Sequence, residues 1–536
     1  MPNQKQDQTD NNTADILISD PLAAHGHKNM RRTVLQAFLA ASKTYGKTTE
    51  ILTDGDGKRF TYAEISRAAF ALSVPIKRLT DAEERIGIML PTGAGAIISL
   101  LSIHAAGRVP AMLNFTAGIA NLKAAIDTAP LKTIVTARKF IEIAELHDLM
   151  EALSGAATII YLEDLKDQIG TGGKLRAVLG PLAPRLFVPR PSPDAPGVIL
   201  FTSGTEGRPK GVVLSHANLL ANIEQIEQHV VLRPEDIFFN PLPTFHCYGL
   251  TAGTLWPIFH GHVVVLHPSP LQTKTIAQRI AKTQSTVLFA TDTFLQKYMR
   301  ASKDGSIGCL RIAVCGAERV RDETRKIAEE KFTMEVLEGY GVTEGAPVLA
   351  ANQPGDIRSG SIGKMLPGIE TRIEPVEGLD DDAGCLWVRG PNIMSGYISP
   401  DNPGQIIPLK DGWHNTGDVV SVDAEGYYVI RGRIKRFAKI GGEMVSLTVV
   451  ENCASALWPD HMHAAAIVPD PKRGEQIVLI TDHPNPKRAE LMRWAQTHGV
   501  PEISVPKKMM SVDSVPVLGT GKLDYVTIGK LAAEAG

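Results

Sequence analysis

Short runs of apolar and β-branched residues alternate with longer amphipathic segments over most of the chain. The runs have the length and composition of buried strands. The intervening segments have helical periodicity; in Thr61–Leu72, for example, Thr61 and Glu64 have the spacing of a capping box. This alternation predicts an α/β fold in which helices cover parallel sheets. The predicted strands are Arg85–Leu90, Thr133–Ala137, Thr158–Leu162, Gly197–Phe201, His262–Leu266, Thr286–Phe289 and Arg311–Val314.

The pattern changes after Gly384, where short strands such as Cys385–Arg389 and Tyr427–Arg431 are separated by Gly turns. These strands predict a small β-rich subdomain. The last block has an amphipathic helix at Leu447–Leu457 and a hairpin around Pro471–Gly474, which are typical of a small α+β domain. We therefore predict a flexible tail (1–30), a large N-terminal domain of several subdomains (31–432), a hinge (433–436) and a mobile C-terminal domain (437–536).

Composition narrows the class of protein. With 536 residues, 43% of them hydrophobic, the chain can bury several cores. Lys plus Arg (56) and Asp plus Glu (58) nearly balance, so nothing in the overall charge attracts nucleic acid. The five cysteines form no C-x-x-C pair, which is typical of buried thiols in a reducing compartment. The longest apolar stretch, Ala94–Ala106, is shorter than the roughly 20 residues that cross a bilayer. We predict a cytoplasmic protein, for which peripheral contact with the inner face of a membrane stays open.

The stretch Thr202-Ser-Gly-Thr-Glu-Gly-Arg-Pro-Lys210-Gly211 follows a predicted strand and suits a triphosphate. Glycines let backbone N–H groups approach an anion closely, while hydroxyls and a lysine add donors and charge. The stretch is not a Walker loop, because no Gly-Lys-Ser/Thr runs into a helix. A solvated turn is the structural alternative. The candidate phosphate-binding residues are Thr202, Ser203, Gly204, Thr205, Gly207 and Lys210.

Four more segments follow in order: Cys315-Gly-Ala-Glu318, Glu338-Gly-Tyr-Gly-Val-Thr-Glu344, Thr416-Gly-Asp418 and Pro516-Val-Leu-Gly-Thr-Gly-Lys522. Each has an ordinary structural explanation, such as a strand-to-helix turn, a helix cap or an exposed lysine. Their order after the phosphate loop nevertheless resembles the acyl-adenylate-forming superfamily. The resemblance extends from about Lys43 to Ile528. Within the superfamily, the chain looks most like the acyl-carrier-protein synthetase half of the bacterial bifunctional 2-acylglycerophosphoethanolamine acyltransferase.

This resemblance implies a nucleotide site. Gly316, Ala317 and Glu318 would line the adenine pocket, and Tyr340, between Gly339 and Gly341, would stack on the base. Thr343 would contact phosphates and Glu344 would hold Mg²⁺, a hard cation that takes oxygen ligands. Asp418 would bind the ribose hydroxyls, and Arg433 would contact ribose or phosphate. ATP and Mg²⁺ are thus the implied cofactors. Glu206 departs from the Ser or Thr of most members.

The resemblance also implies a second half-reaction. Lys522 would contact the acid carboxylate and the α-phosphate. Lys435 would lie at the hinge, where many relatives have Asp, and Gly441, Gly442 and Glu443 would line the tunnel for a thiol. His246, in Asn240-Pro-Leu-Pro-Thr-Phe-His246, would orient the carboxylate of the acid or gate that tunnel. The structural alternative for His246 is a hydrogen-bonded core residue.

The predicted function is ATP-dependent activation of a medium- or long-chain fatty acid to acyl-AMP, followed by transfer to the phosphopantetheine thiol of acyl carrier protein. The basic run Arg431–Lys439 would suit an acidic carrier. Two alternatives stay open. One is a fatty acyl-CoA ligase, because coenzyme A is also anionic; the other is an inactive nucleotide- or lipid-binding homologue.

Overall fold

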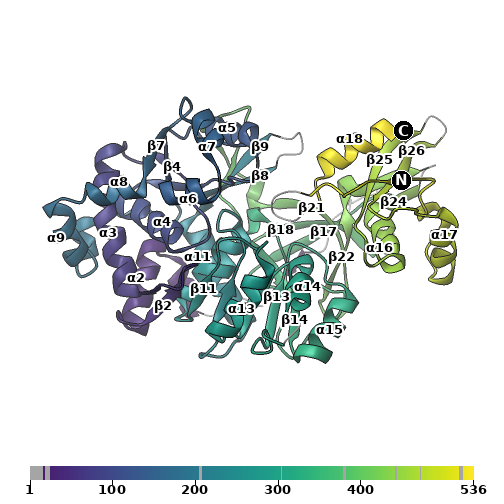
Figure 1. Cartoon of the computed structure of the whole chain (residues 1–536), viewed down its shortest axis with the longest axis horizontal. Coiled ribbons are helices and arrows are strands. Elements are labelled where there is room, and N and C mark those ends of the chain that lie inside the picture. Colours follow the sequence, from purple (N-terminus) through teal and green to yellow (C-terminus); the bar gives the residue numbers. More distant parts are fainter. Residues whose placement is uncertain are drawn as a thin grey trace, which may run out of the picture.

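The computed structural model describes residues 16–18, 24–203, 208–302, 305–377, 379, 382–440, 443–470, 473–517 and 523–535. Strands in these ranges form four sheets, of eight, nine, five and five strands. Figure 1 shows α16 (Leu447–Leu457), α17 (Arg488–Thr497) and α18 (Tyr525–Ala535) in a C-terminal unit at one end of the molecule. The helix α9 (Thr171–Leu179) lies at the opposite end.

The eight-stranded sheet carries the phosphate-loop candidates. Its parallel part contains β4 (Arg85–Ile88), β5 (Val109–Met112), β6 (Thr133–Thr136), β7 (Thr158–Tyr161) and β8 (Pro196–Ser203). An antiparallel edge adds β9 (Pro209–Ser215), β19 (Gly396–Ile398) and β20 (Ile406–Ile407). Its helices include α3 (Tyr62–Leu79), α4 (Ala94–Ala106), α5 (Ile119–Thr128), α6 (Arg138–Ile143), α7 (His147–Leu153), α8 (Leu162–Asp167) and α10 (Pro184–Phe187).

The nine-stranded sheet is also mainly parallel. Its parallel strands are β2 (Glu50–Thr53), β10 (Phe238–Asn240), β11 (Val264–Leu266), β12 (Val287–Ala290), β13 (Ile312–Cys315) and β14 (Glu335–Gly341). The antiparallel strands are β3 (Arg59–Thr61), β15 (Val348–Ala351) and β16 (Lys364–Met365). Helices of this part of the chain are α2 (Val34–Tyr45), α12 (Trp256–Phe259), α13 (Thr273–Thr283), α14 (Asp292–Ala301) and α15 (Asp322–Phe332), while α11 (His216–His229) contacts strands of both sheets. Strands buried on both faces, such as β12, explain the uninterrupted apolar runs.

Two antiparallel or mixed sheets complete the fold. One contains β1 (Ile16–Ile18), β17 (Glu370–Pro375), β18 (Ala383–Arg389), β21 (His414–Val422) and β22 (Tyr428–Arg433). The other contains β23 (Phe437–Ile440), β24 (Glu443–Ser446), β25 (His463–Asp470), β26 (Gly474–Thr481) and β27 (Lys508–Ser511). The predicted α/β class, with a β-rich part and a small α+β part, is confirmed.

The structure confirms the predicted elements and differs at their ends. All seven predicted strands are present, with ends shifted by one or two residues. Thr61 caps α3 with both hydrogen bonds of the capping box, and α16 has the predicted bounds. The helix α3 continues through Pro75 to Leu79, because residues such as Phe70 and Ile76 are buried on its inner face. Two short elements, β1 and α1 (Ala24–Met30), lie within the predicted tail.

Candidate active site

Several predicted residues meet at the carboxyl-end edge of the nine-stranded sheet. Gly316, Ala317 and Glu318 follow β13, Tyr340 lies near the end of β14, and His246 follows β10. In parallel sheets this edge is where ligands usually bind. The β-rich sheet adds a wall, because Asp418 on β21 lies opposite Arg433 on β22.

Asp418 is held by two other residues of the predicted site. Its carboxylate accepts from the Tyr340 hydroxyl at 2.5 Å and from Arg433 Nε at 2.7 Å. Asp418 is 3% exposed, whereas the Arg433 side chain is 62% exposed. Burial, and then the Asp418 charge, raises the pKa of Tyr340 well above its usual value, so the phenol stays a donor. A carboxylate has about four acceptor positions, so Asp418 keeps capacity for another hydroxyl.

Glu344 lies in a second cluster. It belongs to the short 3₁₀ turn Thr343–Gly345 and accepts a 2.5 Å hydrogen bond from the Tyr397 hydroxyl. The Lys210 ammonium lies 5.6 Å from the centre of the Tyr397 ring. Tyr397 thereby links the predicted phosphate-binding lysine to the predicted metal ligand. The sequence did not point to Tyr397, because a Gly-Tyr pair in a three-residue strand belongs to no motif that indicates a chemical role.

The two clusters belong to one site. The charges of Asp418 and Glu344 both raise the pKa of Arg433. Both charges also act on His414, whose pKa is lowered because burial outweighs them. The His414 ring lies 6.4 Å from that of Tyr397. Five predicted residues that are far apart in the sequence thus lie in a single region: Lys210, Tyr340, Glu344, Asp418 and Arg433.

The donor set around Glu344 suits one mode of Mg²⁺ binding. The described ranges contain no group of three or more His, Cys, Asp or Glu side chains that would form an all-protein metal cage. Mg²⁺ usually binds through one or two carboxylates plus substrate phosphates and waters. With Tyr397 on Oε1, the Glu344 carboxylate retains acceptor capacity for such an ion.

The phosphate loop is described only at its base. In the β8–β9 hairpin, Thr202 lies opposite Lys210 and Ser203 opposite Pro209. Gly204, Thr205, Glu206 and Gly207 lie outside the described residues, as do Gly441, Gly442 and Lys522. At the described base of the hairpin, Lys210 approaches Tyr397.

The predicted adenine segment has backbone features that explain its composition. Ala317 has a left-handed φ of 67°. The Glu318 carboxylate accepts from Thr293 N at 3.0 Å, so it also caps α14. A Cβ on Gly341 would lie 2.1 Å from the Pro347 carbonyl oxygen, so only glycine fits there. A Cβ on Gly339 would make only van der Waals contact with the Ala350 carbonyl oxygen, at 3.4 Å.

The predicted acid pocket lies beside Gly316. His246 follows Phe245, with ring centres 5.0 Å apart, and a π-helix begins at Tyr248. The Tyr248 hydroxyl donates to the Val314 carbonyl at 2.8 Å, and its ring lies 3.3 Å from where a Cβ on Gly316 would be. Asn240 donates to the Gly249 carbonyl and to Thr254, so it stabilises the irregular helix. The surroundings of His246 are therefore aromatic and largely apolar.

The C-terminal unit meets the rest through a short basic connection. Lys435 is exposed in the 3₁₀ turn Ile434–Arg436, and Glu443 begins β24. Arg436 pairs with Glu451 at 2.7 Å and stacks on Tyr525 at 3.8 Å. Burial raises the pKa of Tyr525 to about 12, and the charge of Glu318 contributes. The helix α18 thus contacts the hinge turn through the Arg436–Tyr525 pair.

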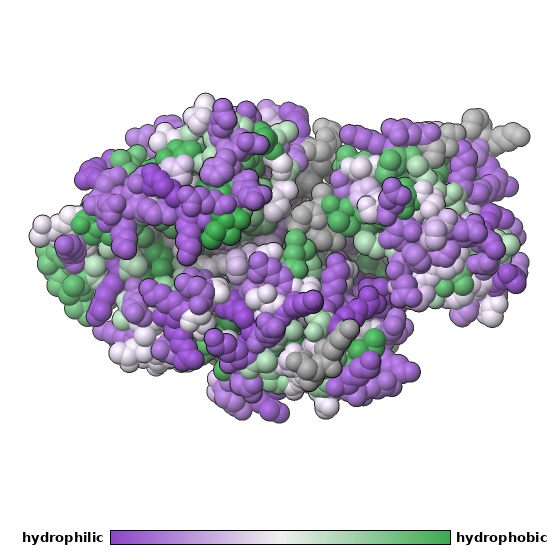
Figure 2. Space-filling view, viewed as in Figure 1, coloured by the Kyte–Doolittle hydropathy of each residue, from purple (hydrophilic) through white to green (hydrophobic). Residues whose placement is uncertain are grey.

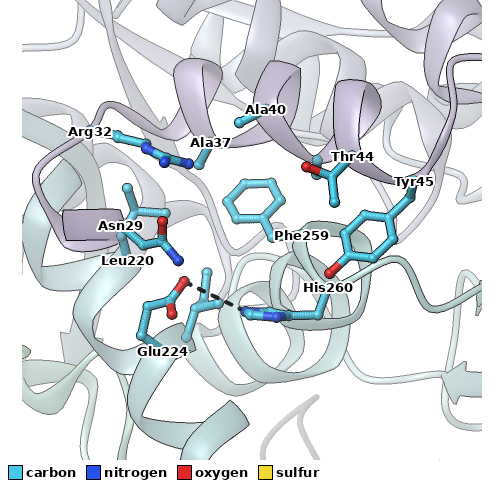
Figure 3. A pocket seen from close by; sticks show the side chains of 12 residues that line it. Asn29, Arg32, Ala37, Ala40, Thr44, Tyr45, Leu220, Glu224, Phe259 and His260 are labelled. Carbon is cyan, nitrogen blue, oxygen red and sulfur yellow. Dashed lines mark ion pairs between the residues drawn. The ribbon is translucent and has the colours of Figure 1, made fainter. Parts of the chain in front are cut away.

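Other features fall outside this site. The cysteines are free, and four of them are buried as predicted, whereas Cys309 is partly exposed. A cavity of about 220 Å³ lies among α2, α11 and α12, where Glu224 and His260 lie 3.7 Å apart (Figure 3). None of its lining residues belongs to the predicted motifs, and we assign it no part in the chemistry.

Comparison with known proteins defines the family. The model of the AMP-binding enzyme family matches residues 38–398, and the chain belongs to this family. A feruloyl-CoA synthase from Amycolatopsis is 27% identical over 87% of this chain and 93% of its own length. A sulfoacetate–CoA ligase from Cupriavidus necator is 32% identical over 54% of this chain and 58% of its own length. A long-chain-fatty-acid–CoA ligase from Yersinia pestis is 29% identical over 60% and 59%, respectively.

Solved structures support the same fold. An anthranilate CoA ligase bound to anthranoyl-AMP has a TM-score of 0.80 and 21% identity, covering 94% of this chain and 98% of that one. An o-succinylbenzoate CoA synthetase from Bacillus subtilis, bound to ATP and magnesium, has a TM-score of 0.77 and 20% identity, covering 91% and 98%. These relatives are CoA ligases, so the sequence-based preference for a carrier-protein synthetase has no support from them.

Proposed function

We propose that this protein is an AMP-forming acid–CoA ligase that activates an apolar carboxylic acid. In the first half-reaction, a carboxylate oxygen attacks the α-phosphorus of ATP and pyrophosphate leaves. In the second, the thiol sulfur of coenzyme A attacks the acyl carbon and AMP leaves. The observation that carries this proposal is the convergence of Tyr340, Asp418 and Arg433 beside Glu344, Tyr397 and Lys210.

In this proposal, different residues bind the ribose, the phosphates and the metal ion of ATP. Asp418 accepts from ribose hydroxyls, since its carboxylate is fixed by Tyr340 and Arg433. Lys210 and the loop before it hold the phosphates, with Thr343 nearby. Glu344 would hold Mg²⁺, which neutralises phosphate charge when bound. Lys522 contacts the reacting carboxylate and α-phosphate in this proposal. Fixed charges of this kind stabilise the charge that develops during attack.

The acid is proposed to be a fatty acid. Phe245, Tyr248 and the Gly316 backbone offer an aromatic and aliphatic wall, with His246 as the polar group beside it. Tyr248 is fixed by its hydrogen bond to Val314 and its ring lies against Gly316, so an acyl chain that enters beside Gly316 would end at this ring. We therefore expect shorter fatty acids to react better than the longest ones.

Coenzyme A is the proposed acceptor for two reasons. The relatives above are CoA ligases. A cavity of about 320 Å³ in the C-terminal unit begins at Ile440, next to the predicted thiol-tunnel loop. Its lining includes the cations Arg473, Arg488 and Lys507, which can pair with phosphates, and also the acids Asp470, Glu475 and Glu502, which offset their charge. After adenylation, rotation near Lys435 would bring the loop that ends at Glu443 toward the acyl-adenylate.

Acyl carrier protein is the second candidate acceptor. The segment Phe437–Ser446 resembles carrier-protein synthetases, and Lys435 and Lys439 are exposed on the basic run. However, Arg431, Arg433 and Arg436 in that run lie beside Asp382, Asp418 and Glu451, which offsets their charge. The attraction for an acidic carrier is thus smaller than the sequence suggests.

The function is tested by pyrophosphate exchange with short to long fatty acids, followed by acceptor competition. We expect acid-dependent exchange and transfer to coenzyme A in the presence of equimolar holo acyl carrier protein. Exchange without transfer to coenzyme A, but with transfer to the carrier, would favour the second candidate. Nucleotide binding without exchange for every acid would show an inactive homologue.

Asp418→Asn should raise the KM for ATP in the exchange reaction roughly tenfold to a hundredfold. The amide accepts on only one oxygen, and a hydrogen bond to a charged group contributes about 1.5–3 kcal/mol. Tyr340→Phe is the matched control: it removes one donor to Asp418 but keeps the carboxylate, so its effect on KM should be smaller. An unchanged KM for Asp418→Asn would exclude the ribose assignment.

A further inference from the structure

The segment around α9 and α10 exposes large apolar side chains to solvent. Figure 2 shows hydrophobic residues gathered at the end of the molecule where Figure 1 places α9. An isolated exposed leucine is ordinary, but a contiguous group of them marks an interaction surface. We call this group the leucine face; its members are Leu175 (58% exposed), Val178 (57%), Leu179 (39%), Leu182 (63%) and Leu186 (82%).

The local packing explains why these side chains point outward. Gly173 and Gly180 are buried, and a Cβ on Gly180 would lie 2.1 Å from the Phe70 ring of α3. Arg176 donates to the carbonyls of Ala105 and Phe187, so its guanidinium faces inward. A surface helix normally turns its apolar stripe to the core. Here glycines and an arginine occupy the inner side, and the leucines remain outside.

The charged side chains within the segment that carries the leucine face all have one sign. Residues 168–193 contain no Asp or Glu. Lys174, Arg185 and Arg190 are exposed and form no ion pair within the described part of the chain. Leucines beside unpaired cations are typical of helices that lie on anionic membranes. Each cation near such a surface adds to the attraction.

We propose that the leucine face docks this protein on an anionic lipid surface. A second copy of this chain would bind the leucine face less well, because a symmetric contact would bring the same cations of both copies together. The lipid surface instead complements both the apolar area and the charge. The face lies at the end of the molecule opposite the C-terminal unit, so docking leaves that unit in solvent (Figure 1). The binding does not depend on the proposed chemistry, and it would place the enzyme where apolar acids partition.

The test is sedimentation of the full-length protein with vesicles, without substrates. Vesicles of phosphatidylcholine alone are compared with vesicles containing equal parts of phosphatidylcholine and phosphatidylglycerol. We expect binding to the mixed vesicles that weakens as salt rises. Leu182→Ser combined with Leu186→Ser should weaken partitioning about tenfold or more, because two exposed leucines no longer enter the interface. Lys174→Glu combined with Arg185→Glu should also abolish the preference for anionic lipid.

Val231→Ser combined with Leu271→Ser is the matched control, because these side chains are 74% and 63% exposed and lie outside the segment. This control should bind like the parent protein. All variants should keep the parent thermal transition and any pyrophosphate exchange, since the changed residues are exposed and outside the active site. Equal binding of the leucine variant and the parent, or no binding of the parent to mixed vesicles, would overturn the proposal. So would a vesicle-free dimer, seen by light scattering, that the leucine variant loses.

Discussion

Glu344→Gln should lower the rate of pyrophosphate exchange about 10²–10³-fold at saturating ATP and raise the Mg²⁺ concentration needed for half-maximal rate. The Glu344 carboxylate accepts from Tyr397, whose ring lies 5.6 Å from the Lys210 ammonium, and an amide is a poorer ligand for a hard cation. The fold should be unaffected, because the amide oxygen still accepts from the Tyr397 hydroxyl. The measurement is exchange rate against Mg²⁺ concentration for variant and parent.

Tyr397→Phe is the companion variant for Glu344→Gln. It keeps the ring near Lys210 but frees the Glu344 carboxylate, and loss of such a supporting hydrogen bond typically costs about 10–100-fold in metal affinity or activity. We expect a shift in the Mg²⁺ dependence that is smaller than that of Glu344→Gln. If both variants exchange pyrophosphate at the parent rate and Mg²⁺ dependence, Glu344 is not the metal ligand.

Arg325→Met should destabilise the fold by about 3–5 kcal/mol, because it leaves the Glu338 carboxylate buried without its partner. Arg325 on α15 pairs with Glu338 at 2.6 Å, and their side chains are 14% and 4% exposed. Arg325 also donates to the Val336 carbonyl, and Glu338 accepts from Val320 N. This pair fixes α15 against β14, which carries Tyr340. Chemical denaturation of parent and variant measures the effect.

The destabilisation by Arg325→Met should shrink as the pH falls below neutrality. Burial raises the pKa of Glu338 above its usual value, and Arg325 opposes that rise. Without Arg325 the folded variant binds a proton at a higher pH than the unfolded chain does, so its stability falls as pH rises through that window. Adding Glu338→Gln to Arg325→Met removes the unpaired charge and should restore much of the lost stability. Equal stability of the single and double variants would contradict this account.

Much of the fold was predictable because its strands are buried on both faces. Continuous apolar runs such as Thr286–Phe289 mark them, and a capping box marks the start of α3. Element ends were less predictable, since tertiary packing carries α3 through Pro75. A three-residue strand such as β1 has too few residues for any period to be visible in the sequence.

The sequence predicts those site residues that belong to motifs of characteristic spacing. It does not predict residues that only the packing of the fold brings into the site. Tyr340, Glu344, Asp418 and Arg433 were found through their motifs, and the structure brings them together. Tyr397 was missed because only the pairing of β19 with β9 brings it to Lys210 and Glu344. The basic run was overvalued as a docking surface, since a linear sequence does not show which cations already face Asp or Glu.

Asp418 and Arg433 are register partners in adjacent strands, and Arg433 is the last residue of β22 before Lys435. In the proposed function, a ribose bound at Asp418 would alter the pairing of this carboxylate with Arg433, the first residue of the predicted hinge. On the proposed assignments, the Asp418–Arg433 contact would couple nucleotide occupancy to the orientation of the C-terminal unit. Release of AMP would then loosen the hinge as a direct result of emptying the sugar site.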